Sequence, residues 1–124
     1  MRYVLLVNTA VEWCGSAACL LAPELIFVGI QGVGLESVRW YGITLSVFGL
    51  MSFLASRNLA LTKADSIWSG MTAYHPLIAL CQVYRIFNYP QERLQGAGAL
   101  IVHTALAIAF IRLYLDISDC PEDS

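Results

Sequence analysis

The sequence predicts an all-α protein, a four-helix transmembrane bundle, and three observations support this fold class. Hydrophobic residues make up 58% of the 124 residues and charged residues only 13%, whereas a soluble domain is about 25% charged. The mean hydropathy is +0.66. The apolar residues also gather in four runs, each close to the length of about 20 residues that a helix needs to cross a bilayer. A chain this short has too much surface to cover with so few charges.

The four predicted helices use most of the chain. They are predicted at residues 3–22, 38–55, 66–87 and 94–115. The first is expected to stop at Pro23, and the join that follows is apolar enough for a short helix at the membrane interface. Residues 1–115 therefore form one predicted transmembrane domain, followed by an acidic tail over residues 116–124.

Four crossings place both termini on one side of the membrane. That side would carry Arg2, Arg57, Lys63 and Arg112, and the other side Arg39, Arg85 and Arg93. The small excess of basic residues favours cytoplasmic termini. A bacterial inner membrane and a eukaryotic organelle membrane both remain open. Aromatic residues near the span ends are expected to form the interfacial belt: Tyr3, Trp40, Tyr41, Trp68, Tyr84, Tyr89 and Tyr114.

Polar side chains within the spans are the candidate site, because lipid cannot solvate them. Asn8 and Glu12 share one face of the first helix, and His75 and Gln82 share one face of the third. The fourth helix contributes His103. At 1.5 Å per residue, Glu12 and His75 lie about 14 Å, and His103 about 18 Å, from the side that bears the termini. We therefore predict that these three face one interior near the bilayer midplane.

Four roles for this polar group stay open. The side chains can simply hold the helices together through hydrogen bonds. They can line a pocket for a small ligand or a lipid headgroup. Glu12 or His75 can move a proton, as in an isomerase or a proton relay. As the last alternative, His75 and His103 can ligate a haem.

Small residues mark one face of the second helix: Gly42, Ser46, Gly49 and Ser56. Such a stripe lets two helix backbones approach closely. The stripe favours a non-enzymatic binding, scaffold or accessory-subunit role as the leading hypothesis. The expected partners are the lipid bilayer, other membrane subunits or an apolar small molecule. The alternative is a membrane-embedded enzyme or carrier with its site at Glu12, His75 and His103.

The formal net charge of the chain is −2. The chain therefore lacks the strongly basic surface that is typical of nucleic-acid-binding proteins, and we expect no nucleic-acid partner.

Two further predictions concern charges and motifs. Arg39 and Arg85 fall on the same predicted side of the membrane. Each can extend its guanidinium to the membrane interface. Alternatively, the two can together bind an anionic lipid headgroup or pair with Glu36. The chain contains no CxxC, HExxH, GxSxG or Gly-rich phosphate loop. We therefore assign no metal site, no resident cofactor and no catalytic residue from motifs, and we expect free cysteines.

The helix plan resembles small four-helix membrane proteins of the DoxX-like type. The matching features are Ala22-Pro23-Glu24 at the end of the first helix and Val38-Arg39-Trp40-Tyr41-Gly42 at the start of the second. Trp68 and His75 on the third helix and His103 on the fourth complete the likeness. The plan is also similar to scaffold proteins of sterol synthesis in the endoplasmic reticulum and to the larger sterol isomerases. The resemblance implies the fold and no particular activity.

Overall fold

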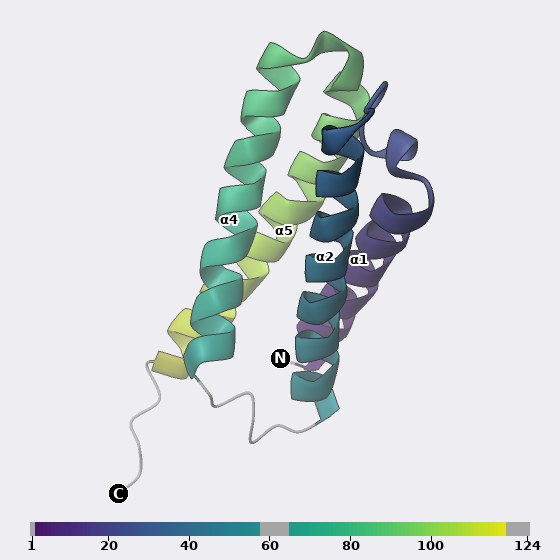
Figure 1. The fold of residues 1–124 in the computed structure, drawn as a ribbon. Helices are drawn as coiled ribbons and strands as arrows, with labels where there is room; N and C mark the ends of the chain where they lie inside the picture. Colours follow the sequence, from purple (N-terminus) through teal and green to yellow (C-terminus); the bar gives the residue numbers. More distant parts are fainter. Residues whose placement is uncertain (1, 58–64, 119–124) are drawn as a thin grey trace, which may run out of the picture.

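The computed structural model describes residues 2–57 and 65–118 and confirms the all-α fold class. Four long helices lie side by side (Figure 1): α1 (Arg2–Leu21), α2 (Val33–Arg57), α4 (Asp65–Asn88) and α5 (Arg93–Ser118). Two short 3-10 helices, η1 (Pro23–Leu25) and η2 (Pro90–Glu92), make the turns between neighbouring helices. The described part of the chain contains no strand.

The helix limits differ from the predicted ones mainly at α2 and α5. Helix α2 begins at Val33 rather than residue 38, because Gly32 takes the left-handed conformation, φ +56°, and its carbonyl accepts the Glu36 N–H. Helix α5 continues beyond residue 115 to Ser118. The first part of the predicted tail is therefore helical, and residues 119–124 lie outside the described residues, as do residues 58–64 of the second join.

The bundle consists of two helical hairpins. Helices α1 and α2 form one hairpin and α4 and α5 the other, and the backbones come closest within each hairpin. The start of α1 and the end of α5 lie at the same end of the bundle, and both 3-10 turns lie at the opposite end (Figure 1). This arrangement is the one that four antiparallel passes require.

The small-residue stripe of α2 packs against α1 within the first hairpin. A Cβ added at Gly42 would lie 2.9 Å from the Cys19 Cβ and 3.2 Å from the Ser16 backbone oxygen on α1. A Cβ at Gly49 would overlap the Trp13 indole. The Ser16 and Ser46 hydroxyls are 2.6 Å apart. The close helix approach predicted from the stripe is confirmed, and its partner is α1 of the same chain.

Two buried apolar clusters make up the core of the described residues: a smaller one of Cys19, Val38 and Leu45 toward the 3-10 turns, and a larger one in the half of the bundle that holds the termini. The buried members of the larger cluster are Leu5, Ala55, Trp68, Met71, Leu106 and Phe110. Trp68 is only 2% exposed, and its ring lies 5.5 Å from that of Phe110. The prediction that Trp68 belongs to the interfacial belt is therefore wrong, because its indole is buried in the core.

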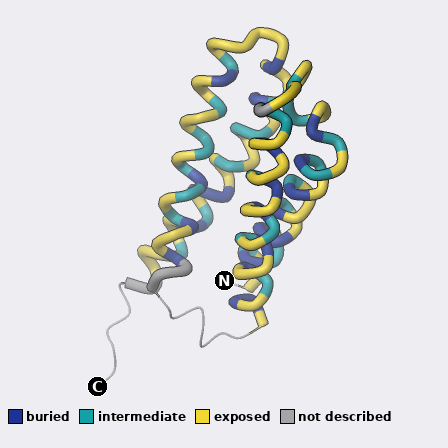
Figure 2. The backbone as a smooth tube through the Cα atoms, in the orientation of Figure 1, coloured by how far each residue is buried: buried dark blue, intermediate teal, exposed yellow. Residues whose placement is uncertain are grey.

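Exposed residues occur along every long helix (Figure 2), and many of them are large and apolar. Examples are Val7, Leu54, Leu80 and Ile101, all about half exposed or more. Monomeric soluble proteins rarely carry so much apolar surface, whereas lipid is a suitable solvent for it.

Three helical segments are long and apolar enough to cross a membrane: Arg2–Leu21, Gly34–Arg57 and Pro90–Asp116. Among the described residues, α4 does not meet the same standard, although its 24 residues span about 36 Å at 1.5 Å each. It carries His75, Gln82 and Arg85 along its length, with Pro76 inside it. Composition therefore supports three spans, and a fourth depends on burying the polar side of α4 against its neighbours.

Candidate functional site

The centre of the bundle brings together Glu12 from α1, His75 from α4 and His103 from α5. One ligand atom from each side chain lies within 4.8 Å of the other two. Glu12 is 1% exposed and His75 is fully buried, while His103 is partly buried. The structure thus brings together the three residues that periodicity and depth placed in one interior.

The two histidines bind each other directly. Their Nδ1 atoms are 3.0 Å apart, so one ring donates its N–H and the other accepts. The His75 ring also stacks on Phe110, with centroids 5.3 Å apart and an interplanar angle of 19°. The His75 Nε2 atom is buried without a hydrogen-bond partner.

The Glu12 carboxylate has one oxygen in a hydrogen bond and one without a partner. The Tyr74 hydroxyl donates to Oε2 at 3.4 Å, and the Tyr41 hydroxyl lies 3.4 Å from that of Tyr74. Oε1 is buried and has no partner. Sequence reasoning assigned Tyr41 to the interfacial belt and did not single out Tyr74. The signal for both was a phenol within a span, because a buried tyrosine hydroxyl needs a hydrogen-bond partner.

Asn8 belongs to a separate polar contact, one helical turn from Glu12 toward the termini. Its amide donates to the Ser52 Oγ at 2.9 Å and approaches the Met71 Sδ at 3.7 Å. It thereby joins α1 to α2 and α4. The structure does not place Asn8 in the group formed by Glu12 and the two histidines.

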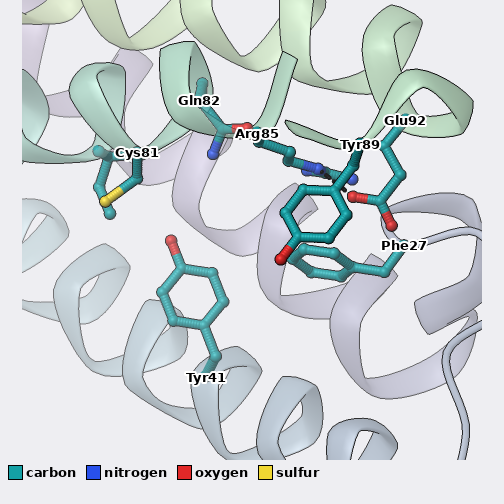
Figure 3. Close-up of a pocket in the computed structure, with 8 residues that line it drawn as sticks. Phe27, Tyr41, Cys81, Gln82, Arg85, Tyr89 and Glu92 are labelled. Atoms are coloured by element: carbon teal, nitrogen blue, oxygen red, sulfur yellow. Dashed lines mark hydrogen bonds and ion pairs between the residues drawn. The ribbon is translucent and has the colours of Figure 1, made fainter. Parts of the chain in front are cut away.

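Arg85, in the last turn of α4, forms a buried ion pair with Glu92 of η2 (Figure 3). Its Nε donates to the Glu92 Oε2 at 2.6 Å, and one terminal nitrogen donates to the Gln82 Oε1 at 3.4 Å. The other terminal nitrogen donates to the Ile26 carbonyl, and the guanidinium lies 4.2 Å from the centre of the Phe27 ring. Gln82 is therefore a partner of Arg85 and makes no contact with the histidine pair among the described hydrogen bonds.

The two arginines predicted to share a lipid headgroup have different environments. Arg85 is 7% exposed and its donors are engaged within the protein. The prediction that it snorkels to the interface is wrong, because Glu92 supplies a closer anion inside. Arg39 is exposed and pairs with Glu36 at 3.0 Å, which is the pairing that the sequence left open.

Two pockets flank Arg85 and share Phe27, Tyr41 and Gln82 in their walls. The first has a volume of about 490 Å³ and extends past Cys81 and Tyr89 (Figure 3). The second has a volume of about 340 Å³ and reaches inward to Glu12 and His103. Its wall also contains Gln95, whose Oε1 is buried without a partner.

The histidine pair does not fit a bis-histidine haem. A haem iron must lie between its two axial nitrogens, with the porphyrin plane separating the two rings. Here the Nδ1 atoms bond directly to each other, and Phe110 covers the His75 ring. No porphyrin-sized space separates the imidazoles.

Comparison with protein-family models, with curated proteins and with solved structures gives no match for this chain. The resemblance to DoxX-like proteins therefore stays a prediction. The chemistry of the site has to be inferred from its own residues.

Proposed function

We propose that this chain is an integral membrane protein, with all four helices crossing the bilayer, that binds an amphiphilic small molecule in its 340 Å³ pocket. One observation carries the proposal. The same pocket is lined by Glu12 and Gln95, and each of these residues has a buried acceptor oxygen without a hydrogen-bond partner.

The unpartnered oxygens define the polar end of the ligand. A buried acceptor left without a partner costs about 1–3 kcal/mol, so a ligand that supplies donors gains from filling both. A hydroxyl or amine group fits this requirement, and a carboxylate does not. The His103 ring lines the same end of the pocket.

The remaining wall defines the body of the ligand. Val11, Leu25, Leu45 and Val102 line the pocket with apolar side chains, which favours a hydrocarbon or aromatic body. The volume lies within the range of about 300–1,000 Å³ of small-molecule sites. An alcohol, quinol or amine with an apolar body is the ligand class that matches both ends.

The same arrangement supports the proposed membrane insertion of α4. His75 bonds to His103 on α5, Arg85 bonds to Glu92 and to the Ile26 carbonyl, and Gln82 accepts from Arg85 on α4 itself. These polar side chains therefore need not face lipid. The excess of basic residues at the end with the termini supports a cytoplasmic location for both ends.

Binding of a small molecule in the pocket is better supported than the scaffold role. That role was inferred from the small-residue stripe of α2, and Gly42 and Gly49 are covered by α1 of the same chain. The stripe therefore no longer points to an external subunit.

The test is retention of small molecules by the full chain purified in mild detergent. Mass spectrometry of an organic extract should detect a hydroxyl- or amine-bearing amphiphile at close to one per chain. Ala99→Leu, which fills the pocket wall, and Gln95→Leu, which removes one acceptor, should each lose it. Ala105→Leu adds the same side chain to an exposed position of α5 and should retain it.

The proposal fails if the wild-type protein carries no such molecule and takes up none from a mixture of membrane lipids and quinols. It also fails if Ala99→Leu and Ala105→Leu retain the molecule equally.

A further inference from the structure

We propose that Glu12, His75 and His103 form a binding site for one divalent first-row transition-metal ion of the zinc type. The proposal goes beyond amphiphile binding and does not require it, because the three proposed ligands are side chains of the protein; Glu12 and His103 also line the proposed pocket, and His75 does not. It assigns a ligand to the one group of histidines and carboxylates among the described residues that comes close enough to share an ion.

The donor set suits such an ion. Two imidazoles and one carboxylate are the protein ligands of many catalytic zinc sites and of non-haem iron sites, and magnesium and calcium prefer oxygen donors alone. The three ligands come from three different helices. The packing of the two hairpins therefore builds the set.

The distances are close to those of a coordinated ion. With metal–nitrogen bonds of about 2.0–2.1 Å, two ligands of a tetrahedral ion lie about 3.3 Å apart. The two Nδ1 atoms are 3.0 Å apart. The ligand atoms of all three residues lie within 4.8 Å of one another, so the carboxylate must move inward by at most about 1.5 Å to complete the set.

The ligand atoms have no competing partner elsewhere in the described protein. Glu12 Oε1 is buried and makes no hydrogen bond, although the residue is only 1% exposed. The Nδ1 atoms of His75 and His103 bond only to each other. An ion would take the place of the proton between the rings, and that proton would move to Nε2 of the ring that donated it, so both imidazoles stay neutral. Glu12 Oε1 would bind the ion through one lone pair and keep the other for a donor in the pocket.

Tyr74 acts as a positioning residue for this site. Its hydroxyl donates to Oε2 of Glu12, and the Tyr41 hydroxyl lies next to it. This contact holds one carboxylate oxygen and leaves the other without a protein partner, available to the ion. Hydrogen bonds to metal ligands typically change metal affinity about 10–100-fold.

The side of the site formed by Glu12 and His103 faces the 340 Å³ pocket. A further ligand on the ion would therefore come from that pocket. A water molecule or the hydroxyl of a bound amphiphile has the required oxygen donor.

The test is metal binding by the full chain in detergent, purified without a polyhistidine tag and stripped with a chelator. Titration with Co²⁺ should give visible d–d absorption that saturates at one ion per chain and is displaced by Zn²⁺. Glu12→Gln, His75→Gln and His103→Gln should each weaken Co²⁺ binding by at least about 100-fold, because they remove a ligand outright. Tyr74→Phe should weaken binding about 10–100-fold and keep the stoichiometry.

Asn8→Ala is the matched control, because Asn8 is equally buried on the same helix and is not a ligand. It should bind Co²⁺ as the wild type does. Helicity and size-exclusion profiles identify any variant that does not fold. If the ligand variants do not fold, the Co²⁺ absorption spectrum of the wild type alone decides whether the site exists. Absence of d–d absorption in the wild type would overturn the site, as would equal affinity in Asn8→Ala and His75→Gln.

The two proposals fail independently. His75→Gln should lose Co²⁺ and retain the amphiphile, whereas Ala99→Leu should retain Co²⁺ and lose the amphiphile. Loss of both ligands in both variants would overturn the separation of the two sites.

Discussion

Breaking the buried ion pair between Arg85 on α4 and Glu92 in the η2 turn should strongly destabilise the protein. The side chains are 9% and 11% exposed, and the Nε–Oε2 distance is 2.6 Å. Removing one partner of such a pair typically costs about 3–5 kcal/mol, because the other charge stays buried without compensation. In Glu92→Gln the guanidinium keeps the Ile26 carbonyl and the Phe27 ring. We therefore expect the lower end of that range, about 3 kcal/mol.

The assay is equilibrium unfolding of the full chain in mixed micelles, followed by far-UV circular dichroism. Glu36→Gln is the control, because it breaks the exposed pair with Arg39, in which the side chains are 61% and 47% exposed. Exposed pairs contribute about 0–1 kcal/mol. The double variant Arg85→Met/Glu92→Leu should lie within about 1 kcal/mol of wild type, because replacing both charges leaves none buried alone.

The reasoning is refuted if Glu92→Gln and Glu36→Gln lower the unfolding free energy equally. It is also refuted if the double variant is less stable than Glu92→Gln, since the cost would then come from lost packing rather than from an uncompensated charge.

Three further predictions use the same unfolding assay. Gly42→Ala should lower the unfolding free energy by up to about 2 kcal/mol, because overpacking of about 1–3 kcal/mol outweighs a helix-propensity gain of about 1 kcal/mol. Gly70→Ala should raise the unfolding free energy by up to about 1 kcal/mol, because the space around its Cβ is open. A change of the same sign in both variants would contradict this reasoning. Phe110→Ala should cost about 3–5 kcal/mol because the ring is fully buried, and a loss under 1 kcal/mol would show that the core collapses around it. A double-mutant cycle of Asn8→Ala and Ser52→Ala should give a coupling near 0.6 kcal/mol, the average for hydrogen bonds between helices in a membrane, and zero coupling would rule out the bond.

Periodicity and depth alone predicted much of the candidate site. Lipid cannot solvate a carboxylate or an imidazole, so Glu12, His75 and His103 had to face the bundle interior. Their similar depths followed from the helix rise. The structure places them within reach of one another. Tyr74, which donates to Glu12, and Tyr41 beside it were not recognised in this way. A phenol within a span is a signal that does not decide between a buried site and the interface, because a tyrosine is suited to both.

The sequence by itself determined the fold class, the number of helices and the limits of α1 and α4 to within a residue. These features depend on local properties: the length of an apolar run, and the prolines and polar residues that end it. Only the tertiary structure decided which polar groups are partners. Arg85 pairs with Glu92 because the η2 turn folds back beside the end of α4, and the first join adds the Ile26 carbonyl and the Phe27 ring. Such contacts depend on the rotation and offset of each helix against the others, which the spacing of residues along one helix does not specify.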